Sequence, residues 1–379
     1  MRVAVNARFL QSGNLEGVGN FTHEICRRLP ELLPDAEFLL CFDRPYDLAY
    51  TAMERTEGRV IFPPARHPVL WKWWFDYSLP RAVRNWGANV IWQPDGFCSL
   101  RTNIPQVTVV HDIAFTRYPK AIPAGVLRYY RKYTPRFLKK AATVMTVSHY
   151  VQEDLRARYG VPAEKMRVTH NGVKPIFRPL TPGERGAARD IYGGGRPYFF
   201  YLGAVHPRKN VDRLIEGYDI YRKTNPAGIP LLIGGRLAWQ TAAVRRAYDR
   251  SPYRDDIRLL GYIAEAELPQ VLGGALALVY PSLDEGFGVP LLEAMHAEVP
   301  VVSSNRSSLP EVGGNAARYF DPEDPVAIAA ALSDIARGPD LRAALIAAGR
   351  SRRECYSWDS AAGIVADTLR RAAGQPNIA

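Results

Sequence analysis

The sequence predicts an α/β fold in which two doubly wound parallel sheets follow one another along the chain. Its 379 residues are too many for one ordinary domain and enough for two. Short apolar runs alternate with helical patterns, which is typical of parallel strands joined by crossover helices. The alternation breaks where Pro179, Pro182 and Gly183 interrupt it. We therefore expect one domain over residues 1–178 and a second over residues 179–357.

The expected strands are short runs rich in apolar residues. In the first domain they are Arg2–Ala7, Glu37–Phe42, Arg59–Pro63, Asn89–Trp92, Gln106–Val110, Thr143–Val147 and Arg167–Thr169. In the second domain they are Tyr198–Leu202, Pro230–Ile233, Ile257–Leu260, Ala275–Tyr280, Val299–Ser303 and Arg318–Phe320. Ligands of open parallel sheets bind beyond the carboxyl ends of the strands, so we expect the site there.

The charge of the chain is unevenly distributed. Residues 1–178 hold 26 Lys and Arg against 15 Asp and Glu, whereas residues 179–379 hold 23 of each. The whole net charge of +11 therefore lies in the first domain, which indicates an anionic partner such as nucleic acid or a membrane surface. The four cysteines are scattered without a C-x-x-C, so neither a zinc site nor a disulfide framework is indicated.

The start of the chain and its apolar runs bear on localisation. Met1 leads straight into a strand pattern, which does not resemble a signal peptide. No apolar run approaches the roughly 20 residues that cross a bilayer. We expect a cytoplasmic protein, with peripheral docking on the inner face of the cell membrane as a further hypothesis.

In the first domain, two strand ends carry candidate functional residues. Gly17 and Gly19 follow the first strand and precede a helical pattern from Phe21 to Leu32, an arrangement that suits a phosphate. A dinucleotide fingerprint would need glycine at Thr22, so a dehydrogenase is not favoured. His111 stands at the tip of the fifth strand, where it can point into a cleft. His149 and His170 end later strands, and we expect them to be structural.

In the second domain, the strongest pattern is a pair of carboxylates eight positions apart. Glu285 lies in a glycine-rich loop after an apolar strand, and Glu293 lies about one turn into the next helix, with Pro290 near its start. Arg208 and Lys209 precede another helix, where side-chain charge and backbone N–H groups converge on an anion. Further strand ends carry glycines, at residues 234–235 and 261–263.

This constellation resembles a retaining glycosyltransferase of family 4, whose GT-B fold has two Rossmann-like domains facing across a cleft. The resemblance spans nearly the whole chain and rests on the segments 17–19, 111–112, 171–173, 208–210 and 285–293. Segments 110–115 and 308–312 are similar to those of bacterial O-antigen and exopolysaccharide mannosyltransferases. In this fold the last helix usually returns to the first domain, and residues 358–379 are the candidate.

The resemblance implies a role for each site residue. Catalysis is implied for His111, Arg208, Lys209 and Glu285. Donor binding is implied for Gly17, Gly19, Arg208, Lys209, Gly261, Ile263, Glu285, Gly286, Phe287, Gly288, Val289, Leu292 and Glu293. In this scheme Arg208 and Lys209 hold the donor diphosphate, Glu293 accepts from the ribose hydroxyls, and Glu285 grips the transferred sugar. The chain departs from the family at Lys174, where many relatives have Asp, and at Ala204, where some have Arg.

The expected reaction moves a hexose, most simply mannose from GDP-mannose, onto a glycan or lipid-linked saccharide in polysaccharide assembly. The sequence has no D-x-D, so we expect neither a metal nor another cofactor. The alternatives are a UDP- or dTDP-sugar donor, a non-catalytic nucleotide-sugar-binding subunit, and a GT-B epimerase or phosphorylase. A nucleic-acid binder would account for the basic first domain but not for the glutamate pair, so nucleic acid is not an expected partner.

A basic helical pattern in the first domain suggests the anionic partner. Arg128, Arg131, Lys132, Lys139 and Lys140 recur on one helical face, with aromatic residues on another. Tryptophans at residues 71–74 add side chains suited to an interface. The simple alternative is a solvated basic face, and the functional hypothesis is docking on anionic lipid.

Overall fold

The chain forms two compact units in the computed structural model, which describes residues 1–11, 13, 15, 17–236 and 241–374. The first unit comprises Met1–Asn171 and Ser357–Ala379, and the second comprises Gly172–Tyr356. The expected boundary lay seven residues further along, after residue 178. The intervening residues are not an open linker, because Phe177 and Leu180 are buried and a Cβ at Gly273 would lie 2.5 Å from Leu180 Cγ.

The first unit is built on a seven-stranded parallel sheet in the order β3-β2-β1-β4-β5-β6-β7. Its strands are β1 (Arg2–Asn6), β2 (Glu37–Phe42), β3 (Thr56–Val60), β4 (Val90–Gln93), β5 (Gln106–Val110), β6 (Thr143–Thr146) and β7 (Met166–Val168). The central strands are buried along their whole length, as expected when helices cover both faces of a parallel sheet.

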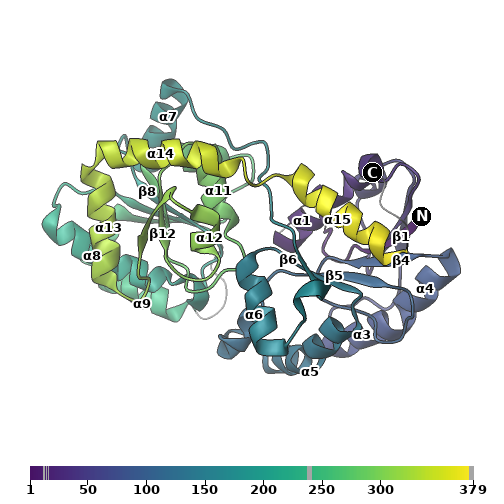
Figure 1. Ribbon diagram of the computed structural model, residues 1–379. Helices are drawn as coiled ribbons and strands as arrows, with labels where there is room; N and C mark the ends of the chain where they lie inside the picture. Colours follow the sequence, from purple (N-terminus) through teal and green to yellow (C-terminus); the bar gives the residue numbers. More distant parts are fainter. Residues whose placement is uncertain (12, 14, 16, 237–240, 375–379) are drawn as a thin grey trace. The chain divides into compact units, whose positions relative to one another are not determined.

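Helices cover both faces of this sheet. They are α1 (Gly17–Cys26), α2 (Leu29–Leu32), α3 (Pro68–Trp73), a π-helix (Trp74–Ser78), α4 (Leu79–Trp86), α5 (Ala124–Lys140), α6 (His149–Tyr159) and α15 (Trp358–Ala372). The C-terminal α15 packs against α1 and α2, while α3 packs against α5 on the opposite face (Figure 1). Two contacts anchor α15: Arg167 Nη1 lies 2.5 Å from Asp367 Oδ2, and Thr169 Oγ1 donates to Ala361 O at 3.3 Å.

The second unit is built on a six-stranded parallel sheet in the order β10-β9-β8-β11-β12-β13. Its strands are β8 (Phe199–Leu202), β9 (Leu231–Gly234), β10 (Ile257–Gly261), β11 (Ala277–Tyr280), β12 (Val301–Ser304) and β13 (Ala317–Phe320). Its helices are α7 (Pro182–Ala188), a π-helix (Arg189–Gly193), α8 (Val211–Thr224), α9 (Ala242–Arg250), α10 (Leu268–Gly274), α11 (Val289–His296), α12 (Leu309–Gly313), α13 (Pro325–Arg337) and α14 (Pro339–Arg353). Helix α8 packs against α9 and α13, and α11 packs against α12 and α14 (Figure 1).

In both sheets the strand order reverses beside the first strand, because later strands are added on its other side. In the first unit the reversal lies between β1 and β4, and in the second it lies between β8 and β11. At such a point the connecting helices leave to opposite faces, so a crevice opens beyond the carboxyl ends of the two strands. The residues that follow β8 and β11 are those the sequence singled out, Arg208, Lys209 and Glu285.

Every expected strand is present, and two expectations about element bounds are wrong. The third strand was expected at residues 59–63 but spans Thr56–Val60, because the polar residues before Val60 pair with β2 and Pro63 has no N–H for a ladder. The helical pattern from Phe21 to Leu32 is not one helix. The chain leaves α1 at Cys26, and the short α2 begins at Leu29 with Pro30 in its first turn.

Candidate functional site

The candidate site of the second unit lies where the loops after β8 and β11 meet. A short 3-10 turn (Pro207–Lys209) follows β8 and leads into α8 through Asn210, whose φ is 60°. The two loops are tied together, because Leu283 N donates to Arg208 O at 2.9 Å. The buried Asn210 amide also donates to Pro281 O at 3.1 Å and to Pro322 O at 2.7 Å. These bonds fix the position of both cations relative to the glutamate loop.

Glu285 is the centre of this site. Its Oε1 accepts from Ser282 Oγ at 2.5 Å, from Tyr280 OH at 3.1 Å, and from the Lys209 ammonium. Its Oε2 faces Arg208 Nη1 at 3.3 Å. Arg208 also donates to the carbonyl oxygen of Asp284. Both cations named from the sequence are therefore assembled around one buried carboxylate.

The charge state of Glu285 follows from these neighbours. Burial by itself raises the pKa of this carboxyl, and Lys209 and Arg208 lower it by more, to about 2. The group therefore stays ionised across the physiological pH range. A buried carboxylate between two cations concentrates charge in a small volume, as a site that binds and releases an anion requires.

Two serines that the sequence analysis gave no role hold the glycine-rich loop. Glu285 N donates to Ser307 Oγ at 2.9 Å, and Ser308 Oγ lies 2.9 Å from Glu285 O and 2.8 Å from Phe287 O. Gly288 has a φ of 105°, and a Cβ there would lie 2.6 Å from Leu309 Cδ2. The loop that carries Gly286, Phe287 and Val289 into α11 therefore has little freedom. The sequence signal for this restraint of the loop was the pair of adjacent serines, Ser307 and Ser308, shortly after a strand end.

Glu293 lies on α11 and is half-buried. Burial raises the pKa of its carboxyl to about 7, with Lys174 lowering it and Glu265 raising it. Lys174 Nζ in turn lies 2.6 Å from Glu265 Oε1. Lys174, the position at which the sequence departs from the family pattern, is therefore close enough to Glu293 to affect its pKa. Glu293 is the residue expected to bind the ribose. Leu292, the preceding residue, is fully buried, so its side chain packs in the core.

The ends of β8, β9 and β10 form a glycine platform. Gly235 N donates to Gly261 O at 2.6 Å, and a Cβ at Gly235 would lie 2.0 Å from Gly203 O. Gly261 has a φ of 68° and Ile263 follows it, nearly buried. Gly203, Gly235 and Gly261 are half-buried, and the close approach of the backbone leaves no room for a side chain at Gly235.

In the first unit, the two glycines after β1 differ in what surrounds them. A Cβ at Gly17 would have no atom within 4 Å, whereas a Cβ at Gly19 would lie 2.5 Å from the carbonyl oxygen of Phe9. Gly19 is therefore required by packing in the structure itself. Arg8, which follows β1, forms a buried ion pair with Asp95 at 2.8 Å, and this pair ties the end of β1 to the end of β4.

His111 lies at the carboxyl end of β5. Its Nε2 is 2.8 Å from Pro94 O, and its ring packs edge-on against Phe21 with centroids 5.1 Å apart. Burial lowers the pKa of His111, with a smaller opposing effect from the Pro94 carbonyl. The ring is therefore neutral near pH 7, with the Nε2 proton directed at that carbonyl.

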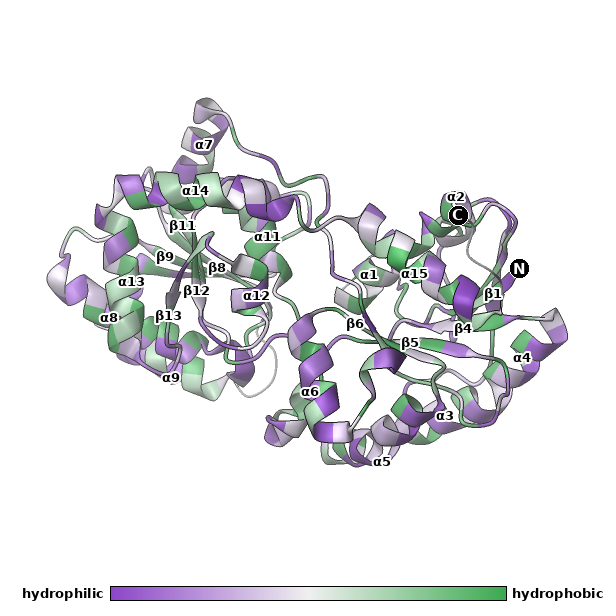
Figure 2. Cartoon of the chain, in the orientation of Figure 1, coloured by the Kyte–Doolittle hydropathy of each residue, from purple (hydrophilic) through white to green (hydrophobic). Residues whose placement is uncertain are grey.

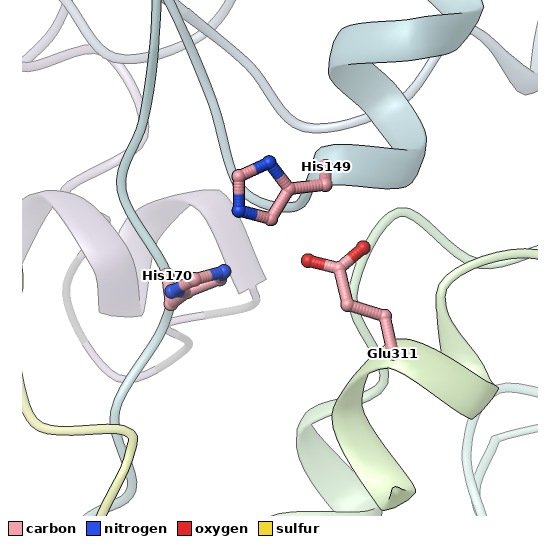
Figure 3. A group of neighbouring side chains, drawn as sticks. All are labelled: His149, His170 and Glu311. Carbon is pink, nitrogen blue, oxygen red and sulfur yellow. The ribbon is translucent and has the colours of Figure 1, made fainter.

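His149 and His170 also lie at strand ends of the first unit. Their ring centroids are 5.8 Å apart in an edge-on arrangement. Figure 3 draws both side chains. His149 begins α6, and His170 follows β7. The third side chain drawn in Figure 3, Glu311, belongs to α12 of the second unit.

Tyr280 is the functional candidate that sequence reasoning missed. It is the last residue of β11, is buried, and lies with its hydroxyl between Lys209 and Glu285. A tyrosine that closes an apolar strand reads as a core residue. Only the fold reveals that its hydroxyl reaches the charged cluster.

Known proteins that resemble this chain share its two-sheet architecture. The model for glycosyl transferases group 1 matches residues 190–352, and the model for glycosyltransferase family 4 matches residues 15–176. Solved structures with the same fold include Anabaena Alr3699/HepE in complex with UDP and glucose (TM-score 0.72, 17% identity, 97% of this chain and 98% of that one). Sucrose-phosphate synthase from Thermosynechococcus elongatus is similar as well (TM-score 0.76, 16% identity, 98% of each chain).

Curated relatives match at higher identity. O-antigen chain mannosyltransferase B of Escherichia coli is 32% identical, over 91% of this chain and 93% of the relative. O-antigen chain mannosyltransferase RfbU of Salmonella typhimurium is 30% identical, over 64% of this chain and 65% of the relative. The chain is therefore a glycosyltransferase with the GT-B fold and belongs to glycosyltransferase family 4.

Proposed function

We propose that this enzyme transfers mannose from GDP-mannose, with retention of anomeric configuration, onto a glycan or lipid-linked saccharide in polysaccharide assembly. The names of the two curated mannosyltransferases support the sugar and the pathway class. The observation that carries the proposal is the cluster of Arg208, Lys209 and Glu285 at the point where the second sheet reverses direction.

The cluster suits departure of a nucleoside diphosphate. Glycosyl transfer builds positive charge on the sugar ring and negative charge on the leaving phosphate. Preorganised cations aimed at that phosphate stabilise the transition state. In the proposal, Arg208 and Lys209 bind the diphosphate, and the carboxylate of Glu285 binds a hydroxyl of the sugar. The acceptor attacks on the face of the leaving group, whose phosphate oxygen takes the acceptor's proton.

The remaining roles follow the same scheme. Glu293 accepts from the ribose hydroxyls, and the N–H groups of Phe287, Gly288 and Val289 bind donor oxygens. Gly261 and Ile263 border the base. In the first unit, Gly17 and Gly19 bind donor oxygens, and His111 contacts the transferred sugar with its neutral ring.

A screen of donors tests the substrate. Thermal shift is measured with GDP-mannose, UDP-glucose and a dTDP-sugar, because a ligand that binds the folded state raises its melting temperature. Transfer is then measured by release of the nucleoside diphosphate in the presence of a lipid-linked saccharide. GDP-mannose is expected to give the largest shift and the fastest release. A larger response to a uridine or thymidine donor would overturn the donor, and binding without release would favour a non-catalytic subunit.

The basic helix α5 supports a second proposal, docking on an anionic lipid surface. Arg128, Arg131, Lys132, Arg136 and Lys139 are exposed along it, while Tyr129, Tyr133 and Phe137 are buried. Figure 2 shows hydrophilic residues along this helix. Each cation near an anionic membrane contributes about 1 kcal/mol, screened by salt. Lys140 ends the helix and is half-buried.

An apolar stripe lies on α3 and on the π-helix that continues it. Val69, Trp73 and Tyr77 recur every four residues and are 70%, 56% and 40% exposed. Trp73 stacks on Tyr77 with centroids 4.9 Å apart, and Arg101 lies 4.6 Å from the Tyr77 ring. Aromatic rings beside cations suit the headgroup region of a bilayer. None of the helices in the described ranges combines the length and apolar character needed to cross a membrane.

Liposome co-sedimentation tests the docking surface. Binding is expected to vesicles that contain anionic lipid at low salt, and to be lost when Arg131, Lys132, Lys139 and Lys140 are replaced together by Gln. The matched control replaces Arg245, Arg246, Arg250 and Arg254 of the second unit, which are exposed and carry the same total charge. Equal binding to neutral vesicles, no binding to either kind, or equal loss in the control would overturn docking through α5.

A further inference from the structure

The hydroxyl of Tyr280 bridges the two charged groups of the site. It accepts a hydrogen bond from Lys209 Nζ at 2.7 Å and donates one to Glu285 Oε1 at 3.1 Å. The Lys209 ammonium also lies 5.1 Å from the centroid of the Tyr280 ring. One buried side chain thus contacts the cation through both its hydroxyl and its ring.

The position of Tyr280 is itself tightly constrained. It ends β11, and its ring lies parallel to that of Tyr201 on the adjacent β8, with centroids 6.2 Å apart and an interplanar angle of 16°. Both rings are fully buried. The Tyr201 hydroxyl, by contrast, donates to the backbone oxygen of Ala204 at 3.4 Å. The two stacked tyrosines therefore differ in whether the hydroxyl touches the charged cluster.

The contacts divide the two oxygens of Glu285 between different tasks. Within the described residues, Oε1 accepts from Lys209, Tyr280 and Ser282, whereas Oε2 faces Arg208. A carboxylate oxygen offers about two lone pairs, so Oε1 is saturated and Oε2 retains capacity. An incoming hydroxyl is therefore directed to Oε2.

We propose that Tyr280 is a positioning residue for glycosyl transfer, whose hydroxyl sets the direction of the Lys209 ammonium and reserves Glu285 Oε2 for the transferred sugar. This rests on the proposed function, because it assumes that Lys209 serves the leaving phosphate and Glu285 the sugar. Lys209 has a flexible four-carbon stem, so a fixed acceptor is what gives its charge a direction. Preorganisation of that kind acts on the transition state more than on ground-state binding.

The test compares Tyr280→Phe with Tyr201→Phe, which remove one oxygen each from stacked, buried rings. Melting temperature, nucleoside diphosphate affinity, donor KM and kcat are measured for both. Tyr280→Phe is expected to lower kcat about tenfold or more, the scale of a hydrogen bond to a charged group. Its donor KM and diphosphate affinity should stay within about threefold, and Tyr201→Phe should behave like the wild type.

A double mutant separates positioning from a general effect. In the Lys209→Ala background, Tyr280→Phe is expected to add much less than it costs alone, because two residues that act together are not additive. Full additivity, a kcat within twofold of the wild type, or equal loss in Tyr201→Phe would overturn the proposal. So would a larger fall in melting temperature for Tyr280→Phe than for Tyr201→Phe, since the hydroxyl would then serve the fold. Absence of transfer by the wild type with any donor would instead overturn the proposed function.

Discussion

At the scale of single residues, the charged cluster makes Lys209 the most sensitive position. Lys209→Ala removes one of three donors to Glu285 Oε1 and, in the proposed mechanism, a cation that binds the leaving phosphate. We expect kcat at saturating donor to fall about a hundredfold or more, the scale of losing one transition-state donor. Steady-state kinetics measure this, with Lys223→Ala, an exposed lysine of α8, as the control. Turnover near the wild-type value would remove Lys209 from the mechanism.

Glu293 is expected to make nucleotide binding depend on pH. Burial raises the pKa of its carboxyl to about 7, so the group is protonated below that pH and charged above it. In the proposed mechanism the charged carboxylate accepts hydrogen bonds from both ribose hydroxyls, whereas the protonated form gives up an acceptor. Affinity for nucleoside diphosphate should therefore rise as the pH increases through about 7 and then level off.

Calorimetric titration of nucleoside diphosphate at pH values that extend about 1.5 units on either side of that pKa checks this expectation. Glu293→Gln should bind more weakly than the wild type and lose the rise near pH 7. Glu285→Gln should keep the rise, because Glu285 does not titrate near pH 7. Burial raises the pKa of Glu285, but the neighbouring cations lower it by more, to about 2. If Glu293→Gln keeps both the affinity and the pH dependence, the ribose role of Glu293 is wrong.

The residues that the sequence identified share a property that the missed ones lack. Arg208, Lys209 and Glu285 are charged groups just beyond strand ends, where ligands of parallel sheets bind and where unpaired charges are rarely buried. Tyr280 and Ser308 are of types that pack or cap in any protein. Their roles come from tertiary contacts across the sheet, which linear spacing does not encode.

At the scale of elements, strands were predictable because a parallel strand buried on both faces is a continuous apolar run. The edge strand β3 was misplaced because it lacks such an apolar run. Its residues Thr56–Val60 are polar and half-exposed, while the more apolar stretch that follows leaves the sheet. The break after α1 escaped prediction because Leu29 continues the helical periodicity, although it is the first residue of a new helix.

The first turn of α1 allows structural and functional glycines to be separated. A Cβ at Gly19 would clash with the Phe9 carbonyl, so Gly19→Ala should lower the melting temperature. A Cβ at Gly17 meets no atom within 4 Å, so Gly17→Ala should fold like the wild type. If Gly17 approaches the donor, its alanine variant should still lose activity. Thermal denaturation and initial rates measured together decide this, and full activity of Gly17→Ala would remove it from the donor site.

At the scale of the whole molecule, each of the two units contributes a reversal point with polar residues beyond its strand ends. The alternation of strands and helices was enough to predict both sheets. The uneven distribution of charge was enough to predict that the first domain is basic and the second is neutral overall. The identity of donor and acceptor is not encoded at this scale. In the proposed mechanism the identity of the donor depends on the shape of loops such as the one after Gly261, which borders the base.

The charge at the reversal point of the second sheet leads to a prediction about metal. The sequence contains no D-x-D, the pattern that would bridge a diphosphate through a metal ion. Arg208 and Lys209 both lie beside Glu285, and in the proposed mechanism they supply this charge without an exchangeable ion. Transfer should therefore continue when EDTA is added in excess. Initial rates are compared with and without chelator, and again after magnesium or manganese is restored. Complete loss that either cation reverses would show that the two side chains do not neutralise the leaving group alone.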